Sequence, residues 1–119
     1  MAEFAGEPWL VPRPEETCHE MIQRACGAAG FVPDTVAEAT DFAVLTALVA
    51  AGAGVALVPR MALPAGPLAV SLHPPRDPVT RKVFALTGPG AARRPDIARA
   101  LDALSTAAAT ISGGPADHP

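Results

Sequence analysis

The stretch that most constrains this chain spans residues 40–60 and reads TDFAVLTALVAAGAGVALVPR. Its first half has the spacing of an amphipathic helix, and the expected buried stripe consists of Phe42, Leu45, Leu48 and Val49. Two glycines interrupt the pattern, and residues 55–58 follow without a polar member. Because a strand that is apolar on both faces is typical of a parallel sheet covered by helices, the stretch predicts a helix followed by a parallel strand.

Both ends of the expected helix carry recognisable signals. Gly52 and Gly54 are expected to take the chain out of the helix through a left-handed turn and into the strand. At the other end, Asp41 is favoured as the N-cap, with Thr40 directly before it. Because capping requires only one of these two side chains, Thr40 is either a second cap or a binding group.

The remaining elements lie on both sides of this stretch. Strands are expected at residues 8–12, 35–39, 68–72 and 82–87. A helix opening at residues 14–16 should bury Cys18, Ile22, Ala25 and Ala29, and should end at Gly30. A last helix is expected from Pro95, with an apolar stripe of Ile97, Leu101, Leu104, Ala108 and Ile111. This order of elements predicts an α/β fold with a small, doubly wound, mostly parallel sheet.

Composition excludes several classes of partner. The chain has 119 residues and a net charge of −3, and its only adjacent basic pairs are Arg81-Lys82 and Arg93-Arg94, so direct contact with nucleic acid is not expected. The apolar stretch at residues 42–59 falls short of the roughly 20 residues that a membrane span needs. We expect no signal peptide, because the first four residues are acidic and lack an apolar run. Cys18 and Cys26 are expected about 12 Å apart along one helix, which is too far for a disulfide bond. We therefore expect a cytoplasmic protein without membrane contact.

No pattern in the sequence supports catalysis. The glycines at 52 and 54 follow a helix, whereas the dinucleotide-binding fingerprint precedes one. Cys18 and His19 are adjacent on a helix and point about 100° apart, so they do not form a nucleophile–base pair. No pair of residues has metal-ligand spacing. We expect no enzyme, no cofactor and no metal site.

A binding site is expected where the helices begin. Ligands of open α/β sheets bind at the carboxyl ends of strands, and two expected helix starts, at residues 13–17 and 39–42, fall there. Their unpaired N–H groups suit a small anion. Arg13 would add positive charge, and Thr17 and Thr40 would add hydroxyl groups.

Four segments resemble the C-terminal effector-binding region of LysR-type transcriptional regulators. They are GEPWLVP at residues 6–12, AGFVP at 29–33, EATD at 38–41 and LVAAGAGVALVP at 48–59. The last segment commonly reads LVAAGLGVALLP in that family, so Ala53 stands where leucine is usual. The resemblance covers about residues 4–105 of the chain.

This resemblance implies a fold like that of a type 2 periplasmic binding protein, with two α/β lobes around an effector cleft. Residues 4–74 would form the second lobe. Residues 75–111 would be the crossover, the return strand and the C-terminal helix of the first lobe, and residues 112–119 a disordered tail. Thr40, Phe42 and the loop from Pro12 to Pro14 would line the cleft.

The implied function is that of a small-molecule effector-sensing fragment of a LysR-type regulator, lacking the helix-turn-helix and most of the first lobe. The two helix starts and Arg13 favour an anionic effector. An unpaired return strand should drive self-association or pairing with another effector domain. Two alternatives stay open, namely a lobe of a solute-binding protein for transport and a fragment that acts only by dimerisation.

Overall fold

A two-stranded parallel sheet forms the centre of the N-terminal part of the chain. The structure is a computed structural model that describes residues 1–112. It divides into a first unit, Met1–Val79, and a second unit that begins at Thr80. The assignment of residues 4–74 and 75–111 to two lobes stays a prediction. The expected tail lies outside the described residues, except for Ser112 at the end of the last helix.

The helices and strands of the first unit follow the expected order. They are η1 (Ala2–Phe4), β1 (Pro8–Pro12), α1 (Thr17–Ala28), β2 (Asp34–Ala39), α2 (Phe42–Ala50) and η2 (Arg60–Ala62). The predicted strands at 8–12 and 35–39 and the predicted helices after each of them are therefore confirmed. The structure is α/β, as expected, although its sheet is smaller than the sequence predicted.

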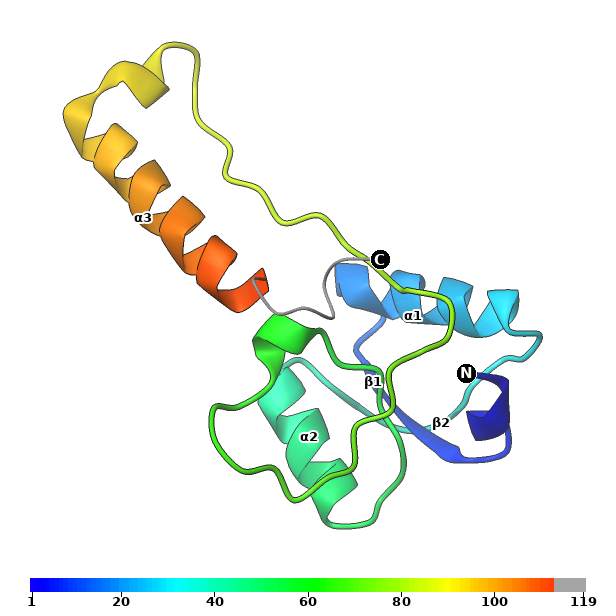
Figure 1. Cartoon of the computed structure of the whole chain (residues 1–119). Coiled ribbons are helices and arrows are strands. Elements are labelled where there is room, and N and C mark those ends of the chain that lie inside the picture. The colour runs from blue at the N-terminus through cyan, green and yellow to red at the C-terminus, as the bar shows by residue number, and fades with distance from the viewer. Residues whose placement is uncertain (113–119) are drawn as a thin grey trace. The chain divides into compact units, whose positions relative to one another are not determined.

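Strand β1 is buried on both faces. Its Trp9 and Val11 form one cluster with Ile22 and Cys26 of α1. Because side chains alternate along a strand, Leu10 points to the opposite face, where α2 contacts β1. Figure 1 shows α1 and α2 on opposite sides of β1. Each fully buried side chain of this size contributes about 1.5–3 kcal/mol, so the burial of Leu10 and Val11 stabilises this unit.

The two helices bury less of their predicted stripes than expected. In α1 the buried residues are Cys18, Ile22 and Cys26, whereas Ala25 and Ala29 are only half-buried. In α2 only Leu45 is fully buried, and the other three members of its stripe are half-buried. A two-stranded sheet is too narrow to cover the whole apolar face of either helix.

The predicted strand at residues 55–58 is wrong in its length. Val55 makes a single parallel bridge to Trp9, in which Leu10 N–H donates to the Val55 carbonyl at 2.8 Å and Val55 N–H donates to the Pro8 carbonyl at 2.9 Å. The next rung of the ladder would need an N–H at Pro12, which proline lacks. A third strand is therefore replaced by a single bridge at Val55. Val55 lies beside β1 on the side opposite β2.

Gly52 and Gly54 have different roles from the shared one predicted. Gly52 has a φ of +84° and closes α2 in the left-handed conformation. Gly54 has no such φ, but a β-carbon there would collide with the Pro8 carbonyl group, whose carbon would lie 3.0 Å away. Gly52 thus makes the turn, and Gly54 lets the chain approach β1 closely enough for the bridge at Val55.

The strands expected at residues 68–72 and 82–87 are absent from the described part of the chain. Residues 82–87 carry exposed apolar side chains, with Val83 66%, Phe84 71% and Leu86 86% exposed. A strand exists only through pairing, and no neighbour among the described residues pairs with this segment.

The second unit contains the short helix η3 (Ala91–Arg93) and the long helix α3 (Pro95–Ser112), which confirms the predicted last helix. Its apolar stripe is largely uncovered within the described residues, because Leu104 is 58% and Ile111 44% exposed. No helix within residues 1–112 is long and apolar enough to cross a membrane.

Candidate functional site

The carboxyl edge of the parallel sheet brings two of the predicted site residues together. The register of β1 and β2 ends with Pro12 opposite Ala39. Arg13 N–H continues the ladder by donating to the Ala39 carbonyl at 3.2 Å. Arg13 and Thr40 are the next residues of their segments, so both leave the sheet at the same edge.

The start of α2 is closed by a side chain. Asp41 is the N-cap residue, and its carboxylate accepts a hydrogen bond from Ala43 N–H at 2.8 Å. This confirms Asp41 as the cap. Thr40 lies outside the cap and is exposed. Its hydroxyl is therefore not needed to begin the helix.

The start of α1 is more open than that of α2. Glu16 is its N-cap residue, but no side chain caps the helix. Thr17 is the first helical residue, and its side chain is exposed. The first turn of α1 therefore lacks a side-chain cap of the kind that Asp41 gives α2, although His19 N–H donates to the Glu16 carbonyl at 3.1 Å.

Arg13 already holds a carboxylate. Its Nε lies 2.9 Å from Oε1 of Glu15, and the two side chains are 55% and 59% exposed. Exposed pairs of this kind contribute about 0–1 kcal/mol, so a ligand carboxylate competes with Glu15 at little cost. The sequence predicted the charge of Arg13 but not its partner.

The other two predicted site residues differ in accessibility. Phe42 is half-buried at the first turn of α2 and keeps part of its ring open. Pro12 is buried in β1, so its ring lies within the sheet and not on the exposed edge. Its expected place in the lining of the cleft stays a prediction.

Sequence reasoning missed Arg60. The chain crosses from β1 to β2 through α1 and returns past β1 to Val55 through α2, so the connections diverge between β1 and Val55. Ligands of open α/β sheets bind at such a switch point. Arg60 begins η2 directly after the third parallel segment, and its side chain is exposed. The sequence feature that could have indicated Arg60 is the Pro59-Arg60 pair, which ends the apolar run at residues 55–58.

Metal-ligating clusters and groups with shifted pKa values are other features that mark functional sites. No group of three or more His, Cys, Asp or Glu side chains within residues 1–112 is arranged to hold a metal ion. Two groups with shifted pKa values lie elsewhere. Burial raises the pKa of the Cys26 thiol in the core, and hydrogen bonds to the backbone and to the Met1 ammonium lower the pKa of Glu3.

An open parallel sheet whose helices begin at one exposed carboxyl edge defines the chain as a ligand-binding α/β domain. The family model described as the LysR substrate binding domain matches residues 1–109, and the chain belongs to this family. No curated protein and no solved structure matches it.

Membership of this family carries several properties. The domain has an α/β fold like that of the periplasmic binding proteins. LysR substrate-binding domains belong to transcription regulators. Domains of this family bind small-molecule effectors, and LysR-type regulators form oligomers.

Proposed function

We propose that this chain is the effector-sensing part of a LysR-type transcription regulator, and that a small anionic molecule binds at the carboxyl edge of its sheet. The parallel register from Pro8 opposite Asp34 to Pro12 opposite Ala39 supports the location. It directs a cationic side chain, Arg13, and a hydroxyl, Thr40, to one edge. The family supports the sensing role.

Each proposed contact has a distinct chemical part. The guanidinium of Arg13 gives up its ion pair with Glu15 and pairs with the anionic group of the effector. Thr17 and Thr40 offer hydroxyl donors, and Thr17 begins a helix that has no side-chain cap. The exposed part of the Phe42 ring provides apolar contact with the body of the effector. Pro12, the last residue of β1, fixes the position at which the loop that carries Arg13 begins.

Binding alone is the proposed activity of this chain. Its net charge of −3 supports the view that another segment of the regulator contacts DNA. Bound effector stabilises the arrangement of the two helix starts, and any coupling to DNA binding follows from that difference in free energy.

Self-association is the second part of the proposal. Val83, Phe84 and Leu86 follow one another in an extended segment, and no backbone hydrogen bond within the described residues joins it to a neighbour. An unpaired, apolar extended segment is a template for pairing with another chain. A second effector domain of the same kind is the proposed partner.

Calorimetric titration with small carboxylates and with their neutral amide counterparts tests the effector site. A carboxylate should bind, its amide counterpart should not, and Arg13→Gln should weaken binding by about 10- to 100-fold, as expected for loss of a charge-assisted hydrogen bond. Arg24→Gln is the matched control, because Arg24 forms a similar exposed pair with Glu20 at 2.9 Å on α1. Equal affinity for acids and amides, or unchanged binding by Arg13→Gln, would contradict the proposal.

A further inference from the structure

The turn that leads from β1 into α1 holds Arg13 and Glu15 in a fixed relation. Glu16 N–H donates to the Arg13 carbonyl at 2.9 Å and closes a four-residue turn. Pro14 occupies the second position of this turn, where the fixed φ of proline is favourable. Arg13 N–H donates to the Ala39 carbonyl at 3.2 Å, so the main chain of Arg13 is held by β2 and by the turn together.

The carboxylate of Glu15 occupies the guanidinium of Arg13. Nε of Arg13 lies 2.9 Å from Oε1 of Glu15, and both side chains are more than half exposed. Because the turn keeps this carboxylate two residues from the cation, its effective concentration at Arg13 does not depend on what is dissolved around the protein. Exposed ion pairs are weak, so the pair competes with anions from solution and can still be replaced.

We propose that Glu15 is a built-in competitor that sets how strongly an anion must bind before the site responds to it. This inference rests on the proposed function, because it concerns the same cation, Arg13. An anion that pairs only with the guanidinium replaces one carboxylate by another anion and gains little. An effector that also reaches the hydroxyl of Thr40 and the ring of Phe42 gains contacts that Glu15 does not supply. The site therefore selects an organic carboxylate over a small inorganic anion such as chloride.

Titration of Glu15→Gln in the full chain, followed by NMR, tests the competitor. The probe is benzoate, a carboxylate with an apolar body, and benzamide is its neutral counterpart. Affinity for benzoate should rise about two- to fivefold relative to wild type, the range expected for release of an exposed ion pair. Affinity for benzamide should stay the same. An unchanged or lower affinity of Glu15→Gln for benzoate would overturn the inference.

A neighbouring carboxylate provides the matched control. Glu16 is exposed and its side chain does not cap α1, so Glu16→Gln removes the same charge one residue away and leaves the ion pair intact. Its gain in affinity should be clearly smaller than that of Glu15→Gln. In the Arg13→Gln background, the two glutamate variants should give equal gains, because the competitor has lost its target. An equal gain in the presence of Arg13, or an excess gain of Glu15→Gln in its absence, would contradict the inference.

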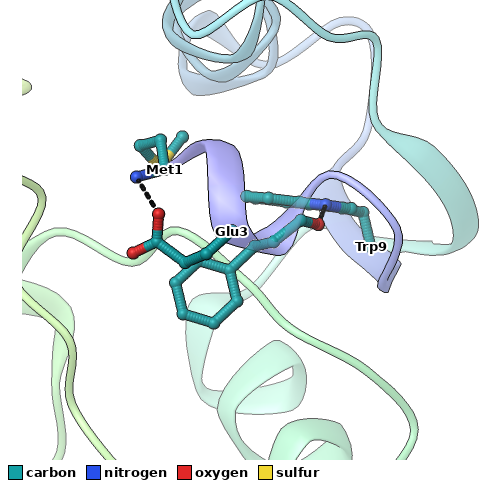
Figure 2. Close-up of polar contacts among 4 residues, drawn as sticks. Met1, Glu3 and Trp9 are labelled. Carbon is teal, nitrogen blue, oxygen red and sulfur yellow. Dashed lines mark hydrogen bonds and ion pairs between the residues drawn. The ribbon is translucent and has the colours of Figure 1, made fainter.

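A distant ion pair of the same spacing is a second control. The Met1 ammonium lies 3.0 Å from Oε2 of Glu3, and Figure 2 shows this pair. It lies at η1, which precedes the amino end of β1, whereas Arg13 follows the carboxyl end. Glu3→Gln should therefore leave the affinity for benzoate unchanged. A gain as large as in Glu15→Gln would attribute the effect to net charge and refute the competitor.

Chloride separates this inference from the proposed function. Raising the chloride concentration should weaken benzoate binding more in Glu15→Gln than in wild type, because the variant no longer shields the guanidinium from small anions. Glu16→Gln in the same solutions corrects for screening by salt. Equal benzoate binding by wild type and Glu15→Gln at every chloride concentration would overturn the competitor and leave the effector site standing. Absence of benzoate binding in both proteins would overturn the effector site, and the competitor with it.

Discussion

Gly54 lies against the carbonyl group of Pro8 so closely that a β-carbon at position 54 has no room. This approach sets the bridge between Val55 and Trp9, which brings the third segment to the sheet. Replacing this glycine therefore acts on the sheet and not on the turn that ends α2.

Gly54→Ala is expected to destabilise the protein by about 1–3 kcal/mol, the usual cost of overpacking a close contact. Urea unfolding followed by circular dichroism measures this change. Gly27→Ala is the matched control, since a β-carbon there meets nothing within 4 Å and the residue is helical. It should stabilise the protein by about 0.5–1 kcal/mol. Equal effects of the two variants would refute the assigned role of Gly54.

Asp41→Ala should remove the cap of α2 and cost about 1 kcal/mol of stability. Thr40→Ala should leave the unfolding midpoint nearly unchanged, because Thr40 is exposed and does not cap the helix. In effector titrations the order should reverse, with Thr40→Ala weakening binding more than its effect on stability explains. A stability loss in Thr40→Ala as large as in Asp41→Ala would show that both residues cap the helix.

Stability should fall in alkaline solution because of Cys26. Burial raises the pKa of its thiol, so the folded state keeps a proton that the unfolded chain releases. The contribution is fully present below the pKa of the unfolded thiol and is lost as the pH rises through the folded value. Urea midpoints at about pH 8 and about pH 10 should therefore drop more in wild type than in Cys26→Ala. Identical drops in the two proteins would contradict this assignment.

Self-association should depend on the exposed segment near Phe84. Phe84→Ser removes a ring that is 71% exposed, and sedimentation velocity should show a shift toward the monomer. Val32→Ser is the control, because Val32 is also highly exposed, at 82%, but lies in the first unit. Its effect on the distribution of species should be small. If Val32→Ser dissociates the protein and Phe84→Ser does not, the association surface lies elsewhere.

Local sequence signals were sufficient to predict β1, α1, β2 and α2. Proline brackets, helix-period apolar spacing and the Asp41 cap all act over a few residues, and the structure contains each of these elements. The family resemblance rested on the same short segments, and the family match confirms it.

Features that depend on distant partners could not be predicted in this way. The apolar run at residues 55–58 has the composition of a strand, but its pairing stops where Pro12 has no N–H to donate. Residues 82–87 carry the apolar run Val83 to Leu86 and still form no strand, because no described segment pairs with them. The stripe of α3 has helical spacing, yet spacing does not provide a surface to cover Leu104.

The candidate site also combines features that local sequence signals predict with features that depend on packing. Parallel strands were predicted, and parallel strands necessarily direct Arg13 and Thr40 to one edge, so that juxtaposition followed from the sequence. The ion pair between Arg13 and Glu15 and the burial of Pro12 depend on side-chain packing, so they could not be predicted from the sequence. Whether these residues hold an effector stays a prediction.

The missing amide hydrogen of Pro12 has one more consequence. Beyond Val55, no backbone hydrogen bond within the described residues joins residues 56–58 to β1, so their main-chain groups are not part of a ladder. We expect a molecule bound beside Arg13 at this edge to meet these peptide groups as well. Pro12→Val would restore the missing N–H donor and lengthen the sheet. The main-chain groups of residues 56–58 would then be paired within the sheet and not open to a ligand.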